Sequence, residues 1–269
     1  MKRTLLTRYF LVTFFWSWII WISTALLCKA GVIGDQPADK VIKTVVLVLG
    51  AFGPLVGALV AVRSEKNKGG VGLYLKRFLS FNIGYKAFIF PLLILCGTTL
   101  LAWFLPSLFG YEKISMLLPS AWVFVPYIVA MMIFGGGQEE FGWRAYALPK
   151  LEESLGYWKS NILLGTIWAV WHLPLWFIPG SSQQFMHFVG FLMLTVGYSL
   201  LFSWFKKLAG GKPFSGIYVH GLANAFIPLF PILNMQQGTP QPAFWIWVSL
   251  TLLSGIAVGL ATTKKQIER

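Results

Sequence analysis

Long runs of apolar residues constrain this chain more than any other feature of its sequence. Windows of about 20 apolar residues, the length that crosses a bilayer as a helix, recur along the whole chain. They predict about eight transmembrane helices, at residues 9–27, 42–62, 86–108, 117–136, 160–178, 185–205, 214–232 and 243–262. The composition agrees, since 57% of the residues are hydrophobic and only 12% are charged. We therefore expect an all-α polytopic membrane protein in which residues 1–269 form a single integral membrane domain.

The basic residues are distributed unevenly between the two sides of this arrangement. The formal net charge of +13 would suggest a nucleic-acid partner if it were clustered on a soluble domain. Under the predicted spans, however, 18 of the 22 Lys and Arg residues fall on the side of the two termini, and the others are Lys29, Lys40, Lys43 and Lys113. Positive charge in short loops marks the cytoplasmic side. We expect both termini in the cytoplasm, membrane lipids as partners and no nucleic acid.

Other local features fit the same class of protein. The first apolar run is longer than the usual core of a signal peptide, which predicts an uncleaved first helix. Residues 63–77 predict a short basic loop that leads into an interfacial helix. Cys28 and Cys96 are the only cysteines, so the chain has neither a disulfide framework nor a thiolate metal cluster. The compact form of the chain, without extensions, favours the plasma membrane of a prokaryote.

A few polar residues interrupt the apolar runs. The segment GGGQEEFGWR places Glu139, Glu140 and Arg144 directly behind the run 117–136. Charged side chains at that depth are costly and need a reason. The glycines at 135–137 predict either a close approach of another helix or a bend just ahead of the glutamates. The remaining candidates for chemistry are His172 in WAVWHLP, and His220 with Asn224 in HGLAN.

Helical spacing predicts which of these residues pair and which share one helical face. If EEFGWR is helical, Glu140 and Arg144 are i,i+4 neighbours in the order that favours an ion pair. Glu139 is rotated away from that partner and stays available. His220 and Asn224 share one helical face. Helices entering from the side of the termini would bring all of these residues to the inner half of the membrane.

This set of side chains predicts a hydrolase. A carboxylate with an imidazole can activate water, and a second imidazole with a carboxamide can donate hydrogen bonds to a developing oxyanion. Neither HExxH nor GxSxG occurs in the chain. His172, His220 and Glu139 could instead hold zinc or iron as two His and one carboxylate. Asn224 fits an oxyanion donor better than a ligand, which favours a site without a cofactor and leaves zinc as the alternative.

Three motifs carry a family resemblance. EEFGWR reads as EExxxR, WAVWH as aromatic-xxx-His and HGLAN as HxxxN, in that order. Through them, residues 115–235 resemble the CPBP family, also called the Abi or type II CAAX prenyl endopeptidase family. The resemblance implies an intramembrane endopeptidase of eight helices, with residues 115–235 as its catalytic core and a cavity that faces the cytoplasm. Family naming favours a metalloprotease, whereas the CAAX endopeptidases imply a glutamate mechanism without metal.

The resemblance also implies roles for single residues. Glu139 would be the general base, His172 would help to hold and activate the water, and His220 with Asn224 would form the oxyanion site. The residues that would support them by ordering or packing are Glu140, Arg144 and Trp168. The family often has Phe where Trp168 stands, so Trp168 is expected to be a packing aromatic.

The expected substrate is a membrane-associated or lipidated peptide or protein. Two other classes stay open: a transporter that uses the polar residues as an ion path, and an immunity or scaffold protein of the same fold that binds without cutting. The same residues also have purely structural interpretations. The two glutamates and Arg144 could form an interfacial charge cluster, and His172 and His220 could be hydrogen-bonded core histidines. His187 is expected to have only such a role, and Glu152 with Glu153 to form a solvated loop face.

Overall fold

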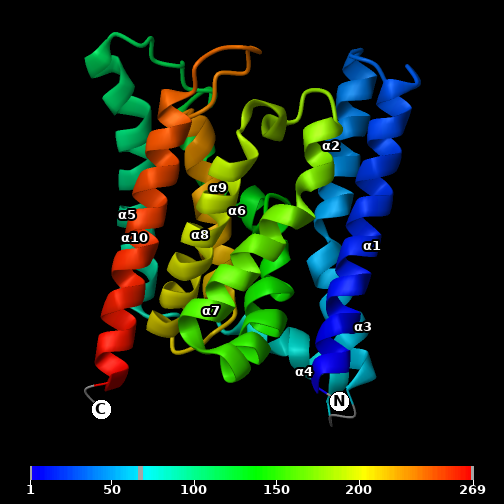
Figure 1. Ribbon diagram of the computed structural model, residues 1–269, viewed down its shortest axis with the longest axis vertical. Helices are drawn as coiled ribbons and strands as arrows, with labels where there is room; N and C mark the ends of the chain where they lie inside the picture. The colour runs from blue at the N-terminus through cyan, green and yellow to red at the C-terminus, as the bar shows by residue number, and fades with distance from the viewer. Residues whose placement is uncertain (1, 66–68, 268–269) are drawn as a thin grey trace.

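The computed structural model describes residues 2–65 and 69–267, which form helices joined by short connections and contain no strand (Figure 1). The α-helices are α1 (Lys2–Lys29), α2 (Pro37–Ala51), α3 (Gly53–Ser64), α4 (Gly70–Lys76), α5 (Tyr85–Phe104), α6 (Phe124–Phe134), α7 (Leu148–Trp171), α8 (Phe188–Leu208), α9 (Phe214–Leu229) and α10 (Pro242–Ile267). Shorter helical turns are η1 (Arg77–Leu79), η2 (Leu105–Phe109), η3 (Ala121–Val123), η4 (Gly137–Phe141), η5 (Trp143–Ala147), η6 (Leu173–Phe177) and η7 (Ser182–Phe185). The all-α prediction is confirmed.

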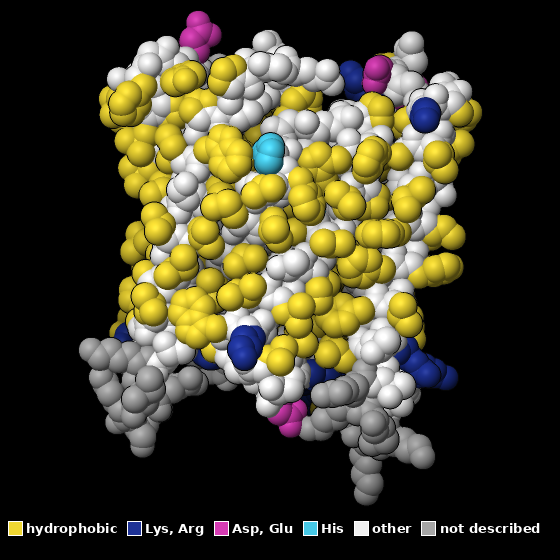
Figure 2. Space-filling view, in the orientation of Figure 1, with side chains coloured by type: hydrophobic (Ala, Val, Ile, Leu, Met, Phe, Trp, Pro, Cys, Tyr) yellow, Lys and Arg dark blue, Asp and Glu magenta, His cyan; other side chains and the backbone are white. Residues whose placement is uncertain are grey.

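Five helical segments of the described chain are long and apolar enough to cross a membrane, and α6 is a shorter apolar helix. The five are Thr4–Lys29, Pro37–Ser64, Tyr85–Phe109, Phe188–Leu208 and Pro242–Thr263. The protein is therefore an integral membrane protein, but the count of eight spans is not confirmed. Figure 2 shows the apolar side chains as a broad belt, with most of the charged side chains of that face near its two ends.

The helices that carry the polar motifs differ most from the predicted spans. The run 117–136 contains an α-helix only from Phe124, and this helix stops at Phe134 ahead of the glycines. Helix α7 covers only part of the predicted run 160–178. It starts earlier, at Leu148, is kinked at Gly156 and stops at Trp171, before the predicted run ends. Apolar composition locates these helices without fixing their ends, which depend on glycine and on partners in the bundle.

The bundle has two ends, which we define as faces. The terminal face carries the start of α1, the end of α10, the connection from α4 to α5 and the turn between α8 and α9 (Figure 1). The distal face carries the turn between α1 and α2, the connection from α5 to α6, residues 178–187 and the connection from α9 to α10. The predicted interfacial helix is α4, which lies at the terminal face.

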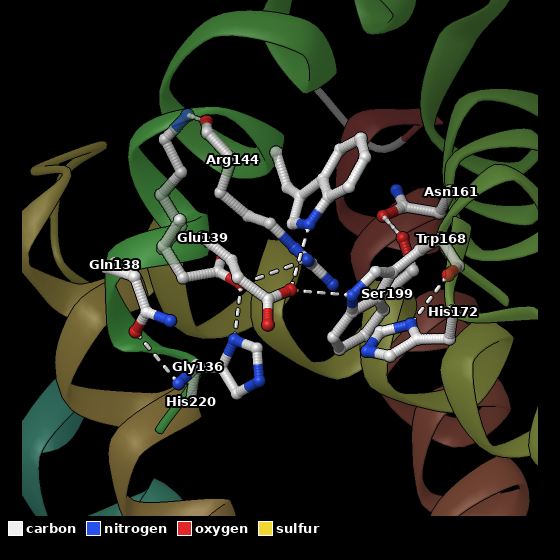
Figure 3. Close-up of polar contacts among 12 residues, drawn as sticks. Gly136, Gln138, Glu139, Arg144, Asn161, Trp168, His172, Ser199 and His220 are labelled. Carbon is white, nitrogen blue, oxygen red and sulfur yellow. Dashed lines mark hydrogen bonds and ion pairs between the residues drawn. The ribbon is translucent and has the colours of Figure 1, made fainter. Parts of the chain in front are cut away.

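Packing arranges the motifs around a common centre. Helix α1 packs against α2 and α3, α8 packs against α7 and α10, and α6 packs against α9. Small residues allow the closest approach, since a side chain at Gly57 of α3 would overlap Thr13 of α1. Between α7 and α8, the Ser199 hydroxyl donates a buried hydrogen bond of 3.0 Å to Asn161 (Figure 3). The turn η4 contacts α3, α6 and α9 and so lies at the centre of the bundle.

Candidate active site

The glycines at 135–137 provide both a bend in the chain and a close approach of another helix, the two alternatives expected from the sequence. Gly136 has φ +116°, a backbone conformation that favours glycine, and the chain bends there from α6 into η4. A Cβ atom at Gly136 would also overlap the ring of His220 and the amide of Asn224. The Gln138 side chain closes the bend by accepting a hydrogen bond of 2.9 Å from the Gly136 backbone N–H. The bend therefore brings the glutamates against α9.

The segment EEFGWR is not a regular α-helix. Residues Gly137–Phe141 form a 3-10 turn and Trp143–Ala147 a π-helical turn. The predicted ion pair forms nevertheless, with Arg144 Nη1 donating to Glu140 Oε1 at 3.0 Å. Both side chains are almost completely buried, with relative exposures of 1% and 0%. Irregular helical turns of this kind often mark functional sites, because they re-aim side chains that a regular helix would place elsewhere.

Glu140 holds a second partner that sequence spacing did not indicate. His220 Nδ1 lies 2.8 Å from the same oxygen, Glu140 Oε1. The Arg144 guanidinium is 4.5 Å from the Trp168 ring centre and 5.0 Å from that of Phe202, positions that suit cation–π attraction. Glu140 therefore orders not only its own turn but also the histidine of the HxxxN motif.

Glu139 has different partners from its neighbour. Its Oε2 atom accepts hydrogen bonds from the indole N–H groups of Trp168, at 2.8 Å, and Trp143, at 3.1 Å. Within the described residues, neither Arg144 nor any other cation pairs with Glu139. Trp168, expected as a packing aromatic, also donates its N–H group to this carboxylate. A Phe at that position would lack this donor.

His172 lies just beyond the end of α7 and is held by the residue four positions earlier. Its Nδ1 atom lies 2.8 Å from the Trp168 backbone oxygen. Since a carbonyl only accepts, Nδ1 carries the proton and Nε2 of the neutral ring is an acceptor. The ring also packs edge-on against Trp171 and Phe191, at 4.6 Å and 5.1 Å between ring centres. His172 therefore has a fixed orientation.

His220 and Asn224 lie on one face of α9, as predicted. With Nδ1 of His220 facing Glu140, its Nε2 atom lies on the side of Gly136. The Asn224 amide donates a hydrogen bond of 2.5 Å to the Gly135 backbone oxygen. One N–H of that amide is thus used for structure, and the second remains for another acceptor.

A cavity of about 520 Å³ joins these groups. Glu139, His172, His220 and Asn224 all contribute to its lining, together with Trp168. Figure 3 shows Glu139, Trp168, His172 and His220 gathered in this region, contributed by segments far apart in the sequence. Apolar side chains make up most of the remaining wall. Two imidazoles, a carboxylate and an amide in an apolar cavity can bind and polarise a water molecule and a carbonyl group.

The alternative metal site would use the same side chains. In the described part of the chain, no three His, Cys, Asp or Glu residues are gathered closely enough to hold a metal ion. The Nδ1 atoms of both histidines face protein acceptors, so Nε2 is the ring atom that could reach a metal or a substrate. His172, His220 and Glu139 line one cavity.

Some residues were missed or misjudged from the sequence. Trp143 was missed, although it stands i,i+4 from Glu139, the spacing that correctly predicted the pair Glu140 and Arg144. Glu152 is not on a solvated loop, because it lies in α7 and accepts a hydrogen bond of 3.1 Å from Ser203 of α8. His187, expected to be structural, precedes α8 and packs 5.6 Å from the Trp245 ring.

Comparison with known proteins agrees with the motifs. Residues 120–226 match the family described as type II CAAX prenyl endopeptidase Rce1-like. The chain is also similar to a CAAX prenyl protease 2 of Methanococcus maripaludis, with 26% identity over 180 residues. That alignment covers 65% of this chain and 64% of the relative, so the chain spans slightly less than two thirds of the relative's length. By its motifs and these matches, the chain is similar to the CPBP family over the part that carries the three motifs.

Proposed function

We propose that this protein is an intramembrane endopeptidase that hydrolyses a peptide bond of a membrane-associated or lipidated peptide or protein. The observation that carries the proposal is the meeting of Glu139, His172, His220 and Asn224 at one cavity within the helical bundle. Such a constellation has no packing purpose, because buried ionisable groups in a membrane protein are costly to keep. The name of the relative from Methanococcus maripaludis supports the same activity.

In the proposed mechanism, Glu139 is the general base. Its Oε2 atom is held by two indole N–H groups, which leaves Oε1 to take a proton from a water molecule that also donates to Nε2 of His172. The water oxygen attacks the substrate carbonyl carbon, and the carbonyl electrons move to its oxygen. Glu139 then passes the proton to the leaving amine as the C–N bond breaks.

The developing oxyanion would be stabilised from α9. Asn224 donates its second amide hydrogen, and His220 donates from Nε2 when its ring carries both protons. Glu140 and Arg144 do not touch the substrate in this scheme. They position His220 through Nδ1. The proposal uses water activated by Glu139, with zinc as the alternative.

The first prediction tests the base. The wild type and Glu139→Gln, purified in detergent, are incubated with candidate membrane-associated peptides, prenylated and unprenylated, and the products are identified by mass spectrometry. We expect Glu139→Gln to lower cleavage by about 10²–10⁴, the contribution typical of a positioned general base. Its melting temperature should change little, because the amide oxygen still accepts from the indoles. Glu112→Gln, an exposed glutamate at the distal face, is the matched control.

The other outcomes of this experiment separate the alternatives. Full cleavage by Glu139→Gln would show that the base is assigned wrongly. Binding of peptide without cleavage by either protein would favour a scaffold or immunity protein, and ion flux abolished by Glu139→Gln would favour a transporter. Loss of wild-type cleavage with a chelator, and its return with stoichiometric zinc, would replace the metal-free mechanism with a zinc mechanism.

A further inference from the structure

The segment between α3 and α5 lies along the terminal face of the bundle (Figure 1). We call residues 70–86, which comprise α4, η1, the following connection and the start of α5, the interfacial arm. Tyr74, Phe78 and Ile83 of the arm are buried against the bundle. The apolar side chains between them and just beyond are exposed, namely Leu73, Leu75, Leu79, Phe81 and Tyr85. Such a set at the end of a membrane-spanning bundle is stable where it meets the boundary of headgroups and acyl chains.

The interfacial arm carries positive charge and no acidic residue. Lys76, Arg77 and Lys86 are all exposed, and the sequence contains no Asp or Glu between Glu65 and Glu112. In the described part of the chain, none of the three cations forms an ion pair with a carboxylate. Basic side chains beside an apolar surface at the membrane boundary attract acidic phospholipids.

Two carboxylates of the terminal face are engaged elsewhere. Glu65, at the end of α3, lies 3.2 Å from the Lys150 ammonium. Glu152 of α7 accepts a hydrogen bond of 3.1 Å from Ser203 and lies 3.8 Å from the Lys207 ammonium. The negative charge that complements the arm therefore has to come from outside the described chain.

The buried side of the interfacial arm contacts the segments that carry two of the polar motifs. The Tyr74 hydroxyl donates a hydrogen bond to the backbone oxygen of Phe141, within EEFGWR. The Phe78 ring stacks on the Phe141 ring, with 3.8 Å between ring centres. Further along the arm, Phe81 packs edge-on against Phe214, the first residue of α9, at 4.8 Å. The position of the arm is therefore coupled to the turn of the glutamates and to the helix of the HxxxN motif.

From these observations we propose that the interfacial arm binds the headgroups of acidic phospholipids, and that this binding holds the EExxxR segment in place. The phosphate of a lipid such as phosphatidylglycerol supplies the negative charge, while its acyl chains cover the exposed apolar side chains. A free phosphate ester offers the same charge without an acyl chain, so a lipid is the occupant that fits both features of the arm. Only the effect on cleavage rests on the proposed function. Lipid binding and its effect on stability do not.

Fluorescence quenching tests the lipid preference at the arm itself. In a background with Cys28→Ser and Cys96→Ala, Leu79→Cys carries a bimane fluorophore, because Leu79 is 66% exposed. The protein is reconstituted in nanodiscs of phosphatidylcholine and phosphatidylglycerol, with equal numbers of brominated acyl chains placed on one lipid or on the other. We expect stronger quenching when phosphatidylglycerol carries the bromine. Soluble glycerol phosphate, which has the headgroup charge but no acyl chain, should not reduce this difference.

Charge variants show whether the arm causes the preference. Lys76→Gln combined with Arg77→Gln removes two of its cations. One basic side chain near an anionic surface changes lipid affinity about 5-fold, so this variant should bind phosphatidylglycerol about 25-fold more weakly and lose the difference in quenching. Lys29→Gln combined with Lys40→Gln, at two exposed lysines of the distal face, is the matched control and should keep it. Equal quenching by both lipids in the wild type, or an unchanged preference after loss of Lys76 and Arg77, would overturn the proposal. Competition by glycerol phosphate would do so too, in favour of a free phosphate ester.

Tyr74→Phe separates lipid binding from its consequence, because it removes the hydrogen bond to Phe141 and leaves the cations in place. Phosphatidylglycerol should raise the melting temperature and the cleavage rate of the wild type. Tyr74→Phe should keep the preference in quenching and lose most of both effects. A response of Tyr74→Phe equal to that of the wild type would show that the arm does not transmit lipid binding. Absence of cleavage in every sample, with the preference and the stabilisation intact, would refute the proposed function alone.

Discussion

Two adjacent glutamates show how position decides chemistry at the scale of single residues. Glu140 is held by Arg144 and His220, whose donors both reach Oε1. Glu139 is held by the neutral indoles of Trp143 and Trp168 and keeps a face towards the cavity. One carboxylate is thus held by charged partners, whereas neutral donors orient the other, which pairs with no cation among the described residues.

The indole of Trp168 provides the prediction at this scale. Trp168→Phe keeps an aromatic ring but removes the donor to Glu139 Oε2. A hydrogen bond to a charged group contributes about 1.5–3 kcal/mol, so we expect kcat to fall by about 10- to 100-fold, with little change in KM. Steady-state cleavage kinetics measure the effect. Trp245→Phe, on the exposed side of α10, is the control, and unchanged kcat in Trp168→Phe would return Trp168 to a packing role.

At the scale of elements, the decisive feature is the break between α6 and α7. The chain leaves α6 at Phe134, bends at Gly136 and continues through η4 and η5 before α7 begins at Leu148. A continuous α-helix would carry the two glutamates past α9. The bend keeps them within hydrogen-bond distance of it instead, as the contact between Glu140 and His220 shows.

Gly136→Ala tests this bend. An alanine there meets two penalties, the positive φ, which costs a non-glycine residue about 1–2 kcal/mol, and overlap with the side chains of His220 and Asn224. Gly211→Ala meets only the first, since Gly211 has φ +79° and open space around it. We expect Gly136→Ala to lose cleavage and to lower the melting temperature clearly more than Gly211→Ala. Equal effects of the two variants in thermal unfolding would mean that the close approach is unimportant.

At the scale of the whole molecule, charge is distributed unevenly between the two faces. The terminal face carries most of the basic residues, whereas the distal face is nearly neutral. This asymmetry predicts how the bundle is oriented in the membrane.

Reporter fusions give the prediction at this scale. A green fluorescent protein fused after Arg269 should fluoresce, because the basic loops keep the terminal face in the cytoplasm, where the reporter folds. Alkaline phosphatase, which is active only outside the cytoplasm, should be active when fused after Gly34 in the turn between α1 and α2. Opposite results from both reporters would show that the chain has the inverted orientation in the membrane.

The sequence by itself determined the class of the fold, and its motifs named residues that the fold brings to one cavity. Runs of about 20 apolar residues specify membrane-spanning helices because unpaired backbone groups are too costly in lipid. Local spacing specified the pair Glu140 and Arg144, since residues four apart meet on most helical turns. The three motifs and their order also carried the resemblance to the CPBP family. All of these are properties of short segments, so the local sequence is enough to determine them.

Only the tertiary structure decided the partners of these residues. The contacts of Glu139 with Trp168 and of Glu140 with His220 join residues 29 and 80 positions apart. They depend on the depth and rotation of whole helices, which packing sets and local periodicity does not. The sequence names the reactive groups, and the packing of the bundle decides which of them meet at one cavity.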